Sequence, residues 1–284
     1  MANICTDGVD TGFVALGYAK VAFLGLIQGI TELLPISSTA HMRIVPALLG
    51  WQDPGSAFSA AMQLAALAAI ISYFWSDVRG LIVGSAQGLI ARDFQRPELR
   101  LVFGMIVATI PIVIGGLLLS KILNTCDSPL RSLNVIGIAC IVMGLLLALA
   151  EFNGSRRRDL SQATIIDAAV IGLAQVGALI PGVSRSGSTL TAAMFLGLKR
   201  EEAARYSFLL GLPAIALAGL KELYALYQVH LGADGWSILA VGLAVGAVSA
   251  FAAIWGLMRV MQGFSSWPFV VYRIFIGGLI LGIA

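Results

Sequence analysis

The residues best suited to chemistry begin in a polar segment near the N-terminus of an otherwise apolar chain. Gln28 and Glu32 are four residues apart, so on a helix their side chains share one face. Pro35 ends that helix, and the hydroxyls of residues 37–39 are suited to cap the next one. The free amides and the dipole at the start of that second helix attract negative charge. This segment therefore predicts an anion site at a break between two half-helices.

The same break offers groups for acid–base and nucleophilic chemistry. His41 follows Ser38 by three residues, so the two side chains are expected to lie together on the second half-helix. Ser38 is a candidate nucleophile, His41 a candidate proton carrier, and Glu32 a group that activates the nucleophile. Attack by His41, or directly by water, is an alternative. The serines could instead only cap a helix, and His41 could be an interfacial histidine without a chemical role.

A second polar segment, residues 181–189, has the composition of a phosphate cradle. It combines glycines, four hydroxyls and Arg185, whose guanidinium matches two phosphate oxygens at once. Glu32 and Arg185 each cost about 2.5–3.5 kcal/mol inside apolar membrane sequence, so they indicate a functional site. A structural ion pair between them is the simpler alternative. The residues expected to bind the substrate are Gln28, Ser37, Thr39, Ser184, Ser186, Gly187 and Thr189.

The composition of the whole chain is that of a membrane protein. Of its 284 residues, 58% are hydrophobic and 12% are charged, and the mean hydropathy is +0.92. These values lie far outside the range of soluble domains. The net charge is only +3 and the basic residues are scattered, so no nucleic acid is expected to bind. Six stretches approach the roughly 20 apolar residues that a spanning helix needs.

A weak internal repeat organises these stretches. The Gly-Leu-x-Gln sequence at residues 25–28 recurs about 147 residues later at 172–175, and Pro35 with its serines recurs as Pro181 with its serines. Three predicted spans follow each polar segment, so the second half is inverted relative to the first. Proline and hydroxyl residues inside apolar sequence indicate re-entrant hairpins that line a cavity. Chance similarity between short apolar sequences is the alternative.

The predicted fold is therefore an all-α integral membrane protein with two inverted-topology repeats, each a re-entrant helical hairpin plus three transmembrane helices. Residues 1–13 form an N-terminal tail. The first repeat covers 14–151, with the re-entrant segment 14–50 and spans 54–76, 101–119 and 133–150. A basic cytoplasmic loop covers 152–162. The second repeat covers 163–284, with the re-entrant segment 163–198 and spans 206–229, 237–258 and 264–284.

The distribution of Lys and Arg predicts the orientation in the membrane. Basic residues gather in three regions, at 79–100, at 156–158 and at 199–205, whereas the loops around 121–132 and 226–236 are poorer in them. Because cytoplasmic loops carry an excess of Lys and Arg, the three basic regions are expected in the cytoplasm. Both ends of the chain are then expected outside.

At these residues the sequence resembles the undecaprenyl-diphosphate phosphatase family of bacterial cell-wall synthesis, also called the bacitracin-resistance protein family. The likeness runs from about residue 18 to the C-terminus. Residues 28–41 are similar to the family's first motif and residues 181–187 to its second, and residues 206–210 and Tyr272-Arg273 also fit. Two positions depart from the pattern. Gln28 stands where many members have a second glutamate, which weakens a metal-binding role there, and Ala40 stands where glycine is common.

The resemblance implies an enzyme that hydrolyses undecaprenyl diphosphate to undecaprenyl phosphate and inorganic phosphate, recycles this lipid carrier and gives bacitracin resistance. It implies an outward-facing site in the bacterial inner membrane, with catalytic roles for Glu32, Ser38, His41 and Arg185. A divalent cation, Mg²⁺ or Ca²⁺, is expected at Glu32, with Gln28 as a second candidate ligand, and no organic cofactor. The implied partners are a polyprenyl diphosphate lipid, the bilayer and, indirectly through the shared substrate, bacitracin. A homodimer is a further expectation.

A transporter or flippase for a prenyl phosphate lipid is the main alternative, since inverted repeats are typical of transporters.

Overall fold

The described structure is helical almost throughout. The computed structural model describes residues 5–6, 9–123 and 128–284, so parts of the predicted N-terminal tail and of the loop at 121–132 lie outside the described residues. The helices are α1 (Phe13–Leu33), α2 (Ser38–Leu48), α3 (Ser56–Ala61), α4 (Gln63–Tyr73), α5 (Trp75–Ala91), α6 (Pro97–Leu118), α7 (Ser120–Leu123), α8 (Leu133–Asn153), α9 (Ile165–Val176), α10 (Arg185–Phe195), α11 (Arg200–Gln228), α12 (Ala233–Gly263) and α13 (Trp267–Ile283). Three short 3₁₀ helices are η1 (Pro129–Arg131), η2 (Leu160–Gln162) and η3 (Gly177–Leu179). The strands β1 (Cys5–Thr6) and β2 (Val9–Asp10) pair antiparallel at the N-terminus.

Several helices are long and apolar enough to cross a membrane. Six candidate spans occur in the described residues: α1, the pair α3–α4, α6, α8, α11 and α12. A multi-pass helical membrane protein is thus confirmed. The predicted last span corresponds to α13, which has 17 residues. Helix α1 was expected to belong to a re-entrant segment, and it is interrupted near its start by a kink at Gly17 (φ 72°).

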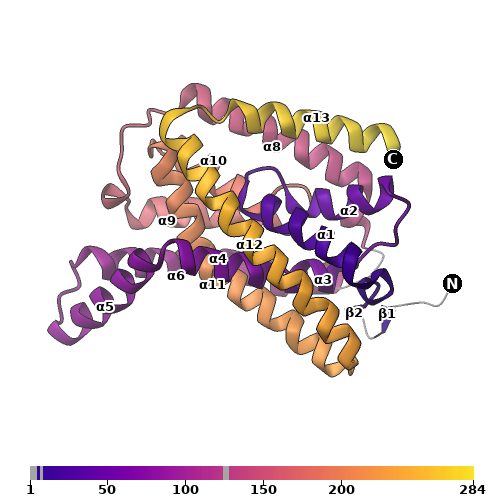
Figure 1. Cartoon of the computed structure of the whole chain (residues 1–284). Coiled ribbons are helices and arrows are strands. Elements are labelled where there is room, and N and C mark those ends of the chain that lie inside the picture. Colours follow the sequence, from indigo (N-terminus) through magenta and orange to yellow (C-terminus); the bar gives the residue numbers. More distant parts are fainter. Residues whose placement is uncertain (1–4, 7–8, 124–127) are drawn as a thin grey trace.

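Helix pairs connect the two halves of the chain. Helix α1 packs along α12, α9 along α6, α8 along α13, and α4 along α11. Figure 1 shows α8 and α13 running side by side and α12 crossing the molecule. Small residues let two of these pairs approach closely. A Cβ atom at Gly25 would lie 2.5 Å from the Gly242 carbonyl oxygen, and one at Gly172 would lie 2.5 Å from Ala108 Cα. Each segment that was predicted to be re-entrant is therefore held against a helix of the other half of the chain.

The Gly172 contact gives a stability prediction. Gly172→Ala forces a methyl group into the backbone of α6, and such overpacking typically costs about 1–3 kcal/mol. We expect a lower midpoint of thermal unfolding for the detergent-solubilised protein. Gly256→Ala on α12 is the matched control, because no atom lies within 4 Å of its added Cβ and alanine favours a helix. A Gly172→Ala midpoint equal to that of wild type would contradict the close approach.

Helix α5 was not predicted. The basic region at 79–100 was expected to be a loop between the spans 54–76 and 101–119, yet the structure forms a helix over Trp75–Ala91. Glycines at 80, 84 and 88 weaken the intrinsic helix signal. Two of them instead allow close packing: a Cβ at Gly84 would lie 2.6 Å from the Glu98 side chain. In Figure 1 this helix lies at the edge of the molecule. It packs against α6, and this tertiary contact outweighs the low helix propensity of its glycines.

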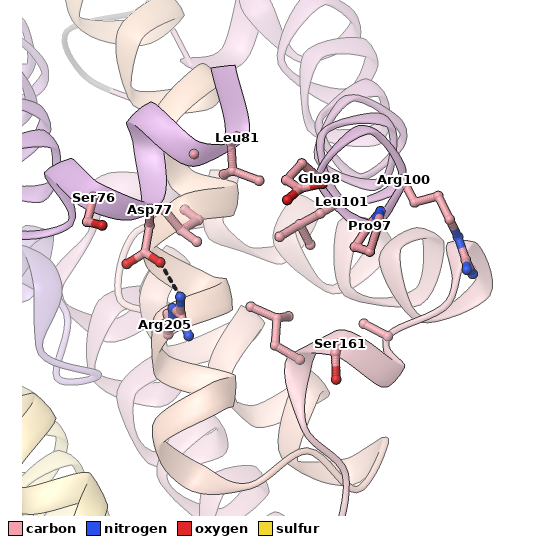
Figure 2. Close-up of a pocket in the computed structure, with 13 residues that line it drawn as sticks. Ser76, Asp77, Leu81, Pro97, Glu98, Arg100, Leu101, Ser161 and Arg205 are labelled. Carbon is pink, nitrogen blue, oxygen red and sulfur yellow. Dashed lines mark hydrogen bonds and ion pairs between the residues drawn. The ribbon is translucent and has the colours of Figure 1, made fainter. Parts of the chain in front are cut away.

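The three basic regions meet on one face of the molecule. Arg205 forms an ion pair with Asp77, which joins α11 to α5, and both residues border a pocket of about 410 Å³ (Figure 2). Lys199 Nζ donates to Asp159 Oδ1 at 2.7 Å, and this hydrogen bond raises the pKa of Lys199. The lining of the pocket includes none of the predicted site residues. The basic regions thus share a side, as a single cytoplasmic face requires.

Candidate active site

The two polar segments form matching breaks between helices. Helix α1 ends at Leu33 and α2 begins at Ser38, while α9 and η3 end at Leu179 and α10 begins at Arg185. Ser37 and Ser184 precede the second helix of each break, with φ angles of 71° and 69°. Each hydroxyl accepts a hydrogen bond from the amide three residues on, at 3.4 Å for Ser37 and 3.1 Å for Ser184. A non-glycine residue with positive φ is uncommon and marks strained backbone.

The tips of the two breaks contact each other. The Gly182 amide donates to Thr39 Oγ1 at 3.0 Å. Ser186 Oγ donates to the carbonyl oxygens of Glu32 and Leu34 at 3.1 and 3.2 Å. These contacts join residues that are more than 140 positions apart in the sequence. The two predicted segments therefore build one site.

Glu32 is the centre of this site. Its side chain is only 6% exposed. Ser38 Oγ donates to Glu32 Oε2 at 2.6 Å, and Gln28 Nε2 donates to the same oxygen at 2.9 Å. The other oxygen, Oε1, faces Arg185 Nη2 at 3.8 Å. The carboxylate is thus placed to accept the proton of the Ser38 hydroxyl.

Arg185 has donors left for a ligand. Its side chain is 10% exposed, and its guanidinium lies against α11, where a Cβ at Gly211 would come within 2.0 Å of Nη1. Within the described residues, Nη1 and Nη2 have no hydrogen-bond acceptor, and Gln28 Oε1 has no donor. Buried polar groups are normally hydrogen-bonded. Unpaired guanidinium donors at a polar break are therefore suited to hold an anion, and Gly211 leaves the space for them.

His41 is held by residues other than Ser38. Its Nδ1 lies 2.7 Å from the Ser37 carbonyl oxygen, and its Nε2 lies 2.6 Å from the Tyr272 hydroxyl. The imidazole and phenol rings are stacked, with centroids 5.6 Å apart. No hydrogen bond between described residues joins His41 to Ser38. The structure thus adds Tyr272, on α13, to the site, and its only signal in the sequence was the Tyr272-Arg273 pair.

Arg273 ties the two breaks together. The side chain is 1% exposed and donates to backbone carbonyl oxygens of both breaks. Nη1 donates to Pro35 O at 3.0 Å, and Nη2 donates to Gly182 O and Val183 O at 2.8 and 3.0 Å. Nε donates to the Cys140 carbonyl oxygen at 3.3 Å. This side chain satisfies carbonyls that the broken helices leave free, which is an architectural role.

Two of the predicted substrate-binding hydroxyls have mainly internal partners. Thr189 is fully buried, donates to the Arg185 carbonyl oxygen at 2.9 Å and contacts the Ser207 hydroxyl on α11. Ser186 is 3% exposed and bonds to the first break. Ser184 and Gly187 lie at the start of α10, where Ser184 also bonds to Ser186 at 3.2 Å. These residues shape the break around Arg185.

The oxygen atoms around Glu32 fit a hard divalent cation. No group of three or more His, Cys, Asp or Glu side chains occurs in the part of the chain that the structure describes. The donors present are the Glu32 carboxylate, the unpaired Gln28 Oε1 and the Ser38 hydroxyl. Mg²⁺ is usually held by one or two carboxylates together with substrate phosphates. The donor set therefore fits a cation that shares oxygens with a phosphorylated substrate.

The fold and the site define a multi-pass membrane protein with a polar junction, suited to an anion, where two breaks between helices meet. A family model described as "Bacitracin resistance protein BacA" matches residues 21–279. The chain is 68% identical over 259 residues to undecaprenyl-diphosphatase 2 of Mesorhizobium japonicum, covering 91% of this chain and 98% of that relative. It is 48% identical over 278 residues to an undecaprenyl-diphosphatase of Trichormus variabilis, covering 97% and 87%. The chain belongs to the bacitracin resistance protein BacA family.

Proposed function

We propose that this chain is an undecaprenyl-diphosphatase that hydrolyses undecaprenyl diphosphate to undecaprenyl phosphate and inorganic phosphate. The observation that carries the proposal is the junction of the two breaks, where Ser38, Glu32 and Arg185 lie in sequence-distant but contacting segments. The names of the curated relatives supply the substrate. This reaction recycles the lipid carrier of cell-wall synthesis. It also links the protein to bacitracin resistance, because the enzyme and bacitracin share undecaprenyl diphosphate as their target.

The geometry supports an order of steps. Arg185 and the amides at the starts of α2 and α10 hold the diphosphate and offset its charge. Ser38 Oγ bonds to the terminal phosphorus while its proton passes to Glu32, 2.6 Å away. The bond from that phosphorus to the bridging oxygen breaks, and undecaprenyl phosphate leaves with the bridging oxygen. Water then attacks the phosphoserine and its proton passes to His41, which lost one in the first step. Glu32 returns its proton to Ser38 Oγ as the bond from that oxygen to phosphorus breaks, and inorganic phosphate leaves.

His41 serves this chemistry as a positioned acid. Its two nitrogens are engaged by Ser37 and Tyr272, which disfavours attack by His41 on phosphorus. Because Nε2 meets the Tyr272 hydroxyl at 2.6 Å, the proton for the leaving oxygen passes from His41 through that hydroxyl. Glu32, with Gln28 Oε1, would hold a divalent cation. Such a cation, when bound, offsets charge on the phosphate oxygens.

The finer topology belongs to the same proposal. Two inverted repeats are supported by the equivalent φ angles of Ser37 and Ser184 and by the reciprocal pairs α1–α12 and α9–α6. An outward-facing site in the inner membrane is supported by the basic regions, which lie together near α5, whereas α3 and the strands lie on the other side of the molecule (Figure 1). The homodimer stays a prediction.

Phosphate release and the Ser38→Ala variant test the proposal together. Purified protein in detergent should release phosphate from undecaprenyl diphosphate without any gradient, which a transporter would not do. Ser38→Ala should lower kcat about a hundredfold, because the nucleophile is lost while Arg185 still binds the substrate. Rapid quenching should trap phosphoserine in the wild-type protein. Unchanged turnover in Ser38→Ala would reject the serine mechanism in favour of His41 or water.

A further inference from the structure

A small pocket lies beside the junction of the two breaks. Thr39 and Pro181, one from each break, line it. Arg43, Asp53 and Arg131 line it as well. These three residues come from α2, from the loop before α3 and from η1, so three separate segments converge there. Their convergence is not needed for the chemistry assigned above.

The pocket is adjacent to Ser38 along α2, because Thr39 lines it. Thr39 and Arg43 are four residues apart on α2 and therefore share one face of that helix. Thr39 follows Ser38 directly and accepts the hydrogen bond from Gly182 at 3.0 Å. A group released at Ser38 thus reaches Arg43 by passing about one helical turn along α2.

The lining of the pocket includes two arginines that both pair with one carboxylate. Arg43 pairs with Asp53, and Arg131 Nη2 lies 3.3 Å from Asp53 Oδ2. Arg43 Nε is buried and has no acceptor among the described residues. Among the described residues, Asp10 is the other carboxylate in electrostatic range, but it accepts from the Gly12 amide at 2.9 Å, and burial raises its pKa. Within the part of the chain that the structure describes, the arginine donors therefore exceed the acceptors that face them.

The pocket is closed to an oxyanion while Asp53 occupies it. Its volume is about 40 Å³, which holds a few water molecules but not a tetrahedral ion with four oxygens. The side chains of Arg43 and Asp53 are 32% and 31% exposed, so their pair borders the surface. Phosphate oxygens match the arginine fork as a carboxylate does. An orthophosphate can hence take the place of the Asp53 carboxylate when the pair separates.

We infer that Arg43, Asp53 and Arg131 form an exit site for orthophosphate, in which Asp53 competes with the departing ion for the two arginines. The inference rests on the proposed hydrolysis, which makes inorganic phosphate the second product. The arginines draw the ion from the junction, and Asp53 displaces it to the surface on the side of residues 51–55 and 128–132. Asp53 thus keeps the site from retaining its product.

The inference predicts opposite changes in the phosphate inhibition constant for the arginine variants and for the aspartate variant. In the full-length protein in detergent, added inorganic phosphate should inhibit hydrolysis and raise the midpoint of thermal unfolding. Arg43→Gln and Arg131→Gln should each raise the phosphate inhibition constant about tenfold, since each removes a charge-assisted contact. Asp53→Asn should lower that constant several-fold, because asparagine still accepts from the Gly55 amide but no longer competes for the arginines. Arg92→Gln, at an exposed position at the end of α5, is the control with no expected change.

The measurements separate this site from the enzyme activity. Hydrolysis is followed by chromatography of the lipid product, and each protein's rate without phosphate is its own reference. Thermal midpoints are compared in phosphate and in chloride at equal ionic strength. Normal hydrolysis with the same phosphate response in all variants would overturn the exit site and leave the proposed function standing. A shift of the same sign in all three variants, as general destabilisation produces, would also overturn it. Phosphate could raise the thermal midpoint less in the two arginine variants and more in Asp53→Asn while no protein hydrolyses the lipid. That result would support the phosphate site and overturn the proposed function.

Discussion

Replacing Arg185 with alanine is expected to lower kcat/KM for undecaprenyl diphosphate about a thousandfold. Arg185 is the buried cation at the junction, and its Nη1 and Nη2 have no acceptor among the described residues. An arginine aimed at a transferring phosphoryl group typically contributes factors of about 10³–10⁵. Phosphate release from the purified protein measures the effect.

Two companion variants show which property of Arg185 matters. Arg185→Lys keeps the charge but loses the planar fork, so an intermediate rate is expected. Arg205→Ala removes an arginine that pairs with Asp77 on the basic face, and its rate per folded molecule should stay near wild type. Retention of activity within tenfold in Arg185→Ala would remove this residue from the phosphate-binding role.

Glu32→Gln is expected to lower kcat by a similar factor, about a thousandfold, while KM stays the same or falls. The glutamine has nearly the shape of the glutamate, but it cannot take the proton from Ser38, 2.6 Å away. It also frees Arg185 from its counter-ion at 3.8 Å, so in buffer without divalent cations an anionic substrate binds at least as well. Steady-state kinetics over a range of lipid concentrations separates the two constants.

Glu151 provides a matched control for the loss of a buried carboxylate. It is 4% exposed and accepts from Arg200, Arg156 and Ser266 on the basic face. Glu151→Gln should therefore lower the midpoint of thermal unfolding without a specific loss of kcat, because removing one partner from a buried ion pair is destabilising. If Glu151→Gln reduced kcat as much as Glu32→Gln, the Glu32 effect would reflect stability and not chemistry.

Much of the site could be predicted because membrane insertion restricts what an apolar sequence may contain. Glu32 and Arg185 stand out in apolar segments, and a proline before a run of hydroxyls marks each helix break. The contact between Glu32 and Arg185 followed from the similarity of the two segments. Local sequence alone therefore located the breaks and the groups in them.

The remaining features depend on contacts that no local pattern encodes. Tyr272 reaches His41 from 231 positions away, and Gly211 makes room for Arg185 from a different helix. The spacing of Ser38 and His41 predicted neighbours, whereas the structure directs both imidazole nitrogens to other partners. Helix α5 was missed because its glycines lower the helix propensity of the isolated segment. Their value is close packing against α6, which the local sequence does not reveal.

The carbonyl contacts of Arg273 bear on how the protein is made. This residue lies in α13, which follows both breaks in the chain, yet it holds Pro35 from the first break and Gly182 from the second. Until α13 inserts, these carbonyl oxygens lack the guanidinium that satisfies them. The nascent chain therefore assembles the junction fully only after α13 has been made and has packed against both breaks.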